Sequence, residues 1–195
     1  MSNAYKFHKQ EATYFFTMQV VSWVDVFSRK KYCNIICEAL NYCVEKKNLN
    51  IFSYAIMSNH CHLIANAYPS KISDVVRDLK KFSSTEIINS IKQGSESRRD
   101  WMLNVFRNAA AMHARNKCYQ VWTHENHPEE VFSSDFALSK IRYIHNNPVR
   151  AGIVEKPEHY CLSSARDYSG NPGPVKVSIL DLHLLMSGKN SWMVY

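Results

Sequence analysis

The sequence contains no long apolar run and no pattern that would export the protein. Its most apolar stretch, residues 14–23, is interrupted by Thr17 and Gln19 and is soon followed by Asp25. A membrane-spanning helix needs about 20 predominantly apolar residues, so we expect no membrane span. The first residues also lack the basic, then apolar, then small-residue order of a signal peptide. We therefore expect a cytoplasmic protein with no membrane partner.

The six cysteines form no Cys-x-x-Cys pair, which argues against a structural zinc site. Without an export signal, a framework of disulfides is not expected either. Free thiols that serve as small core residues are the simplest interpretation of all six. The cysteines are Cys33, Cys37, Cys43, Cys61, Cys118 and Cys161.

Basic residues outnumber acidic ones, 24 to 17, and the formal net charge is +7. A basic excess of this size suits an anionic partner, and nucleic acid is the usual one. The cations are spread along the chain rather than gathered in a tail. With 195 residues, of which 46% are hydrophobic and 21% charged, the chain has the size and composition of one globular domain.

Apolar residues recur at strand-like and then at helix-like spacing along the chain. In chain order, they predict a strand in residues 12–22, a helix in 29–47, a tight hairpin of strands 51–57 and 60–67, and a helix in 69–93. Further along, they predict a basic linker in 94–99, a helix in 101–115, short strands in 119–122 and 130–132, and a helix in 136–146. Ser134 and Asp135 provide the start signal of that last helix, and Pro148 is expected to end it. This order predicts an α+β fold in which helices flank an antiparallel sheet, as in ferredoxin-like and RRM-like proteins.

A turn-rich segment, Gly-Asn-Pro-Gly-Pro in residues 170–174, has the composition of a linker. We expect one domain in residues 1–170 and a C-terminal tail in 171–195, to which no role is assigned. The tail is partly apolar, so we expect it to dock on the domain or on a partner.

Two histidines, His60 and His62, stand two residues apart in the second strand of the predicted hairpin. Side chains two apart on a strand project from the same face, so both imidazoles can reach one divalent ion, while Cys61 points the other way. Isolated His-x-His pairs are more often unrelated structural residues. Two polar imidazoles on one face of an otherwise apolar hairpin nevertheless need a reason.

A second group of polar residues surrounds Tyr143 in the last predicted helix. Lys140 and Asn147 lie three residues before it and four after it, on the same side. A different, core-facing side is formed by Ala137, Ile141 and Ile144. A phenolic oxygen can attack a phosphate when a metal ion and nearby cations stabilise the developing charge. Asn147 could add an oxygen ligand to an ion held by the histidines, and oxygen ligands favour magnesium or manganese. Spacing alone is explained more simply by a half-buried tyrosine and by an asparagine that ends the helix before Pro148.

Three segments of the chain resemble those of a known protein family. Residues 54–64, Tyr-Ala-Ile-Met-Ser-Asn-His-Cys-His-Leu-Ile, resemble the metal-site hairpin of single-tyrosine HUH transposases, the insertion-sequence and REP-associated tyrosine transposase group. Residues 143–152, Tyr-Ile-His-Asn-Asn-Pro-Val-Arg-Ala-Gly, resemble the catalytic segment of that group, and residues 160–168 resemble the segment that follows it. The two main motifs occur in the expected order, and the similarity runs over residues 5–168.

The resemblance implies the HUH endonuclease fold, a sheet flanked by helices, which agrees with the predicted order of elements. It implies that His60, His62 and Asn147 bind the metal ion and that Tyr143 is the nucleophile. The implied substrate is single-stranded DNA with a hairpin at the end of a mobile element. Cleavage beside the hairpin would leave Tyr143 joined to the 5′ phosphate and would free a 3′ hydroxyl. Some branches of the family share active sites between two subunits, so a monomer and a homodimer are both compatible with the sequence.

Two parts of the chain depart from the family pattern. Cys61 replaces a larger hydrophobic residue between the histidines, with little expected effect because it points away from the metal. In residues 122–130, Trp122 fits the pattern, and His127, Glu129 and Glu130 could support the active site as ligands or acid–base groups. A solvated acidic loop is the simpler interpretation of the two glutamates. Lys140 is expected to support the same site.

Proteins bind single-stranded DNA with cations that follow the phosphates and aromatic rings that stack on the bases. The candidates for phosphate contact lie between the two main motifs, and each alone is more simply a surface charge. They are Arg77, Lys80, Lys81, Arg98, Arg99, Arg107, Arg115 and Lys117.

Two other functions are compatible with the sequence. A domesticated protein could bind DNA hairpins without cutting them, although the histidines, the tyrosine and the asparagine are all intact. A zinc hydrolase could use His60, His62 and a carboxylate such as Glu129, with a metal-bound water as nucleophile. A hydrolase would survive the substitution Tyr143→Phe, and a transposase would not.

Overall fold

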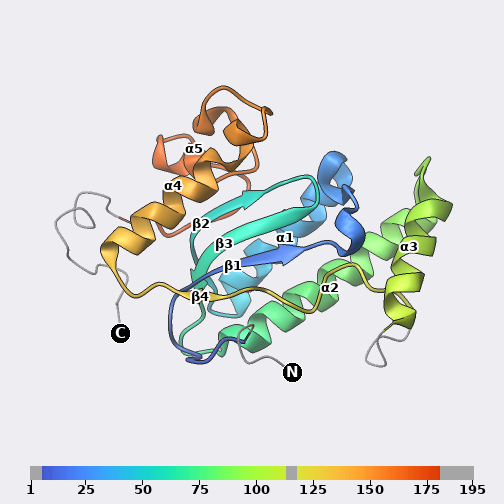
Figure 1. Ribbon diagram of the computed structural model, residues 1–195, viewed down its shortest axis with the longest axis horizontal. Helices are drawn as coiled ribbons and strands as arrows, with labels where there is room; N and C mark the ends of the chain where they lie inside the picture. Colours follow the sequence, from blue (N-terminus) through green and yellow to red (C-terminus); the bar gives the residue numbers. More distant parts are fainter. Residues whose placement is uncertain (1–5, 113–117, 181–195) are drawn as a thin grey trace.

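An open four-stranded antiparallel sheet, in the order β2-β3-β1-β4, forms the centre of the molecule (Figure 1). The computed structural model describes residues 6–112 and 118–180. The strands are β1 (Tyr14–Gln19), β2 (Asn50–Ile56), β3 (His60–Asn66) and the short β4 (Glu129–Glu130). The helices are α1 (Lys30–Lys46), α2 (Ile72–Gln93), α3 (Arg99–Ala111), α4 (Ser134–Arg150) and α5 (Ala165–Tyr168), with short 3-10 turns η2 (Val21–Trp23), η3 (Val26–Ser28) and η4 (Pro157–His159). The predicted α+β fold, an antiparallel sheet flanked by helices, is confirmed.

Side chains of the central strands alternate between the two faces of the sheet. Phe16 and Met18 of β1 are buried on one face together with Leu63 of β3. Phe15 and Ile64 belong to a second buried cluster on the opposite face. The period of two residues therefore creates two separate cores, one on each side of the same strands.

The core that contains Phe16, Met18 and Leu63 is the larger of the two. Helices α1 and α2 cover this face of the sheet and lie behind it in Figure 1. Ile36 and Leu40 of α1 and Val75 and Leu79 of α2 recur at helical spacing and are buried. Burying one such side chain contributes about 1.5–3 kcal/mol, so this layer dominates the stability of the domain. Within the described residues, no helix is both long and apolar enough to cross a membrane.

Helix α4 packs on the opposite face of the sheet. Ala137, Ile141 and Ile144 lie on its inner side and share the smaller core with Phe15 and Ile64. The spacing of these three residues predicts that core face, and the structure confirms it. Because the inner side of α4 packs on the sheet, the adjacent side of the helix faces the histidines of β3, which lie on the same face of the sheet.

The outer edge of β2 is covered by the segment that follows α4. Ser164 donates its backbone N–H to the carbonyl of Tyr54 at 3.0 Å. Ser178 donates to the carbonyl of Ile51 at 2.8 Å. The hydroxyl of Tyr168 donates to the carbonyl of Phe52 at 2.9 Å. These bonds satisfy a strand edge that would otherwise be open to pairing with another chain.

The described part of the predicted tail packs on the domain. Val175 is buried in the larger core, and Leu180 is buried in the smaller one. The turn-rich residues 170–174 thus lead into a segment that touches both layers. Residues 181–195 lie outside the described residues, and the domain boundary after residue 170 stays a prediction.

Several local predictions are wrong. Helix α4 continues to Arg150, with Pro148 buried in its last turn, because a proline there removes only one N–H donor and its ring packs inward. The start of α4 is capped by Ser133, one residue before the predicted signal. Residues 119–122 form no regular strand, since Trp122 makes only an isolated bridge with Val20. Helix α3 ends at Ala111, earlier than predicted.

The cysteines are free thiols, as predicted. Cys61 is buried in the larger core, on the face of β3 opposite the histidines. Cys118 and Cys161 are exposed, so the interpretation as core residues is wrong for these two. Both lie in loops outside the helices and strands, where no core periodicity applies.

We predict that Ser133→Ala lowers the free energy of unfolding by about 1 kcal/mol. The Ser133 hydroxyl accepts a hydrogen bond from the N–H of Phe136 at 3.2 Å, and alanine leaves that donor unpaired. Urea denaturation followed by circular dichroism measures the effect. The control is Ser139→Ala, an exposed serine within the same helix, which should leave stability unchanged or raise it by about 0.5 kcal/mol. Equal losses in both variants would contradict the capping role.

Candidate active site

His60 and His62 project from the same face of β3, as their spacing predicts. Their ring centroids are 4.7 Å apart, with an interplanar angle of 74°. In the neighbouring strand β1 they stand opposite Gln19 and Thr17. The sheet register therefore places the pair at the C-terminal end of β1, on the face that carries α4.

Each of the two histidines is held by a hydrogen bond at Nδ1. His60 Nδ1 donates to Oδ1 of Asn59 at 2.7 Å, and His62 Nδ1 is hydrogen-bonded to the hydroxyl of Thr17 at 2.8 Å. A neutral imidazole with its proton on Nδ1 carries a lone pair on Nε2. Metal-binding histidines commonly have such an outer partner, which sets the tautomer and the ring orientation. The pair is therefore suited to bind a metal ion through Nε2.

Burial keeps both imidazoles neutral near pH 7. Burial, followed by the charges of His60 and Lys140, lowers the pKa of His62 to about 3. Burial also lowers the pKa of His60. The neutral imidazole is the form that binds metal ions, so neither ring has to lose a proton before it can act as a ligand.

Helix α4 brings Tyr143 and Asn147 to His62. The amide nitrogen of Asn147 lies 3.3 Å from His62 Nε2, and the ring centroid of Tyr143 lies 5.2 Å from that of His62. Tyr143 is 37% exposed, which leaves its side chain open to a substrate. Because Pro148 lies inside the helix rather than ending it, Asn147 keeps the helical position that aligns it with Tyr143.

The donor set fits a metal ion when Asn147 takes part in it. In residues 6–112 and 118–180, no group of three histidine, cysteine, aspartate or glutamate side chains could hold a metal ion. Glu129 in particular does not complete such a group with His60 and His62. The Asn147 side chain carries a carbonyl oxygen, which suits magnesium or manganese, and its amide nitrogen lies beside His62 Nε2. Two neutral imidazoles and one amide oxygen are thus available on one face.

Lys140 and Glu129 form an ion pair at the border of the site. Lys140 Nζ lies 2.8 Å from Glu129 Oε1 and 4.3 Å from the ring centroid of Phe15. Phe15 stands opposite Glu129 in the β1–β4 pairing and stacks on His62 at 5.8 Å. The pair therefore lies one side chain away from the histidines. His127 precedes β4 with a left-handed backbone, φ 45°, and its role in the site stays a prediction.

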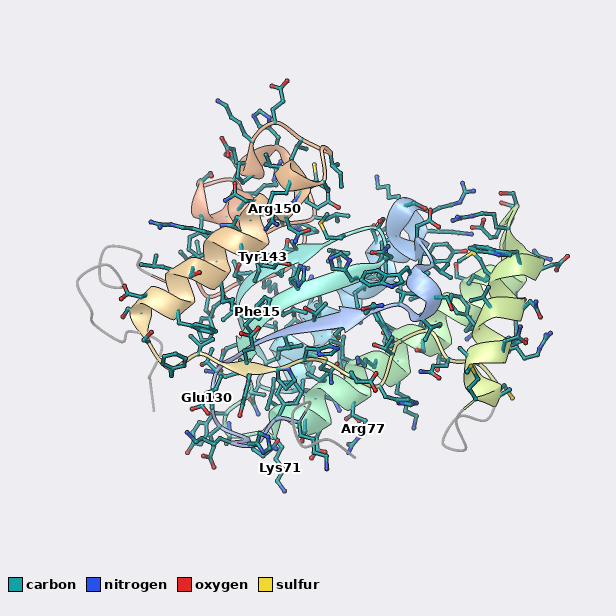
Figure 2. All side chains as sticks on the ribbon, in the orientation of Figure 1. Phe15, Lys71, Arg77, Glu130, Tyr143 and Arg150 are labelled. Carbon is teal, nitrogen blue, oxygen red and sulfur yellow. The ribbon has the colours of Figure 1, made fainter. Side chains whose placement is uncertain are left out.

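Sequence reasoning missed several side chains that contact the site, among them Thr17, Asn59 and Arg150. The guanidinium carbon of Arg150 lies 5.6 Å from the ring centroid of Tyr143, and both residues project from α4 (Figure 2). Arg150 follows Tyr143 by two helical turns, so its spacing carried a signal. Asn59 is the sequence neighbour of His60, whereas the contact made by Thr17 depends on the register of β1 and β3.

His145 lies in a buried polar network that joins α4 to β2. His145 Nε2 is hydrogen-bonded to the hydroxyls of Ser164 at 2.8 Å and Ser53 at 3.2 Å. Its ring packs edge-on against Tyr168, with centroids 5.1 Å apart. Burial lowers the pKa of His145 to about 4, so the ring is neutral at pH 7. The network therefore anchors the tyrosine helix to the sheet without adding charge.

A groove of about 1040 Å³ lies between α2 and residues 118–126. Three predicted DNA contacts, Arg77, Lys80 and Lys81, line this groove, and none of its described lining residues is acidic. Lys80 Nζ donates to the carbonyl of Thr123 at 2.9 Å, and burial lowers its pKa to about 8. Arg77 also forms ion pairs with Asp74 at 2.7 Å and with Asp78 at 3.1 Å. The groove is therefore cationic along α2.

The remaining predicted DNA contacts are dispersed. The contacts within the protein are Arg98 to Asp25 at 2.6 Å, Arg99 to the carbonyl of Ile91 at 3.1 Å, and Arg107 to the hydroxyl of Tyr119 at 3.3 Å. Arg115 and Lys117 lie outside the described residues. A role for these five cations in DNA binding stays a prediction.

The fold and the histidine–tyrosine site define a class of protein. A family model described as "Transposase IS200 like" matches residues 11–146, which is most of the chain. The chain therefore belongs to the IS200-like transposase family. The matched range contains both histidines and Tyr143 and ends just before Asn147.

A solved structure shares this fold. It is described as "Structure of the REP associates tyrosine transposase bound to a REP hairpin", and it matches this chain with a TM-score of 0.61. The match covers 93% of this chain and 93% of that chain, at 16% sequence identity. An identity this low shows a common fold alone. A search of curated proteins found no match.

We predict that, without metal, the free energy of unfolding falls as the pH is lowered from about 6.5 to about 4. The pKa of His145 in the folded protein is about 4, below the ordinary value of about 6.5 that applies to the unfolded chain. Between these values the unfolded chain binds a proton that the folded protein does not, so acid favours unfolding. The loss from this histidine is on the order of 2–3 kcal/mol, and above about pH 7 its contribution is constant.

Urea denaturation of His145→Gln in EDTA checks this prediction. A glutamine amide can bond the two serine hydroxyls but does not titrate, so the variant should depend less on pH than the wild type. The matched control is His159→Gln, which changes an exposed histidine and should keep the wild-type dependence. If all three proteins lose stability equally in acid, His145 is not held neutral by the fold.

Proposed function

We propose that this transposase binds single-stranded DNA that bears a hairpin, and that it cleaves and rejoins this DNA through Tyr143. One observation carries the proposal: Tyr143 stands beside two neutral, anchored histidines that Asn147 joins from the same helix. A phenolic nucleophile next to candidate metal ligands is the arrangement that phosphoryl transfer through tyrosine needs.

His60, His62 and Asn147 would hold a magnesium or manganese ion. Bound there, the ion would supply Lewis-acid chemistry that polarises the scissile phosphate. Thr17 and Asn59 orient the two rings in advance, which lowers the cost of ordering the ligands. Burial keeps the rings in the neutral form that ligation requires.

Tyr143 is the proposed nucleophile. Its Oη forms a bond to the phosphorus while the bond between phosphorus and O3′ breaks. The phenol loses its proton and the departing O3′ gains one, so the products are a 5′-phosphotyrosine and a free 3′ hydroxyl. Arg150 places positive charge over the Tyr143 ring, where it stabilises the negative charge that develops on the phenolic and phosphate oxygens.

Rejoining reverses the cleavage with a different DNA end. A 3′ hydroxyl attacks the phosphotyrosine, the bond between phosphorus and Tyr143 Oη breaks, and the phenol regains its proton. One phosphate ester replaces another in each direction. The reaction therefore needs no external source of energy.

One chain can supply every group of the proposed site. Tyr143 on α4 approaches His62 on β3 of the same chain, and Asn147 does the same. We therefore infer that cleavage does not require a tyrosine from a second subunit. A homodimer would serve to bring two DNA ends together rather than to complete the site.

The cationic groove along α2 is the proposed contact for DNA phosphates. Arg77, Lys80 and Lys81 line it, and none of its described lining residues is acidic. Phosphates are bound mainly by such cations. The solved structure of the same fold is described as bound to a REP hairpin, which supports a hairpin as the ligand of this chain.

We predict that the protein forms a covalent adduct with labelled single-stranded hairpin DNA from beside its own gene, in magnesium or manganese. The adduct should survive denaturing electrophoresis. Tyr143→Phe removes the attacking oxygen and should abolish it, and His60→Ala should nearly abolish it. The matched control is Tyr42→Phe, which changes an exposed tyrosine on α1 and should react like the wild type.

Other results would point to other functions. An adduct in Tyr143→Phe would refute the proposed nucleophile. Tight hairpin binding without an adduct would indicate the domesticated DNA-binding protein. Metal-dependent hydrolysis that survives Tyr143→Phe would indicate the hydrolase, although the described residues provide no third histidine, cysteine or carboxylate beside His60 and His62.

We predict that a double variant, Arg77→Gln with Lys81→Gln, binds the hairpin less tightly and with a weaker dependence on salt. Each phosphate contact contributes about 0.7–0.9 to the slope of log K against log salt concentration, so two lost contacts should lower it by about 1.4–1.8. Fluorescence anisotropy over a series of salt concentrations measures the slope. The matched control, Lys30→Gln with Lys46→Gln, removes the same charge from α1, away from the groove. Equal slopes in the two double variants would contradict the groove contact.

A further inference from the structure

Trp23 presents an exposed indole beside the histidine pair. The residue is 59% exposed. Its ring centroid lies 6.1 Å from that of His60, with an interplanar angle of 84°. A side chain this exposed contributes little to the core, so core packing does not account for its position next to a candidate metal ligand.

The backbone at Trp23 is strained. Ser22 and Trp23 have φ values of 52° and 55°, in the left-handed region that residues with a bulky side chain rarely adopt. Strain of this kind persists only where the surroundings hold it, and it concentrates at functional sites. A glycine would relieve it at either position. Position 23 instead carries tryptophan, the largest of the side chains.

Asn59 links the main chain of Trp23 to the ring of His60. Its Oδ1 accepts from His60 Nδ1 at 2.7 Å, and its Nδ2 donates to the carbonyl of Trp23 at 3.3 Å. Its own carbonyl accepts from the N–H of Val20 at 2.9 Å. The turn after β1 and the turn before β3 are thus pinned together. The position of Trp23 is therefore set relative to His60.

Four aromatic rings of the site are linked by successive contacts, here called the ring row. Tyr143 neighbours His62 at 5.2 Å, His62 neighbours His60 at 4.7 Å, and His60 neighbours Trp23 at 6.1 Å. A DNA strand whose phosphate reaches Tyr143 and the histidines brings an adjoining nucleotide to the indole. An exposed aromatic face stacks on any base, because every base has a π-face.

We propose that Trp23 is the stacking platform for one unpaired base next to the scissile phosphate. This inference rests on the proposed function, because it takes the bound strand from it. By stacking on this base, Trp23 would help to hold the scissile phosphate at Tyr143. It would contribute to DNA affinity whether or not metal is bound, since stacking needs no ion.

The test measures binding in EDTA by fluorescence anisotropy. The probe is the hairpin oligonucleotide with a single-stranded flank across the cleavage position mapped from the adduct. Trp23→Ala should bind about 5- to 150-fold more weakly, the range that loss of one stacked base implies, and Trp23→Phe should retain most of the affinity. The matched control is Trp101→Ala, which removes an indole that is 50% exposed on α3 and should bind like the wild type.

A set of probes with one abasic position each separates stacking from a structural effect. One abasic position in the flank should weaken binding to the wild type but leave binding to Trp23→Ala unchanged, because the stacked partner is already missing. If every abasic probe weakens both proteins equally, Trp23 does not stack on a base, and the inference is overturned.

Thermal unfolding of Trp23→Gly completes the test. Glycine accepts the left-handed backbone without strain, so its melting temperature should equal or exceed that of the wild type while its DNA affinity falls. A lower melting temperature together with unchanged affinity would show that Trp23 serves only the fold.

The failure of the proposed function and the failure of this inference give different results. A wild-type protein that neither binds the hairpin nor forms an adduct would overturn the proposed function. Wild-type hairpin binding that does not change when Trp23 is replaced would overturn this inference alone.

Discussion

The packing of α4 on the open face of the sheet is the contact on which the candidate site depends. Ala137, Ile141 and Ile144 meet Phe15 and Ile64 in a small apolar cluster. That cluster sets the rotation of the helix about its own axis. With that rotation fixed, the adjacent side of the helix, which carries Tyr143 and Asn147, faces the histidines of β3. Apolar burial thus supplies the geometry, and the polar groups supply the chemistry.

The buried and the exposed side chains of the site have different roles. His62 is buried and His60 is half-buried. Both rings are neutral and hydrogen-bonded, so they are oriented before any ligand arrives. Tyr143 and Trp23 are open to solvent at the two ends of the ring row. Positive charge comes from Arg150 and Lys140, both at the rim rather than at the centre. Under the proposed function, this arrangement leaves the centre to the metal ion, while the cations at the rim attract the DNA strand.

Local periodicity was enough to predict the sheet, the main helices and the shared face of His60 and His62, because period-two and helical spacing act within one element. It failed where tertiary contacts decide. Pro148 stays helical because its ring is buried, and residues 119–122 leave the sheet after one bridge. The contact between Thr17 and His62 depends on the register between β1 and β3, which no pattern within either strand specifies. The strain at Trp23 is invisible in sequence for the same reason, since it is imposed by the neighbouring turn.

The segment after α4 acts as a substitute for a fifth strand. It occupies the hydrogen-bonding edge of β2 through Ser164, Ser178 and Tyr168, and it inserts Val175 and Leu180 into the two cores. The β2 edge of the sheet is therefore closed to pairing with a strand of another chain. Two copies of this chain cannot join their sheets into one continuous sheet through β2. Among the residues that the structure describes, helix faces, loops and the short β4 edge remain available for self-association, and they limit the geometry of a dimer accordingly.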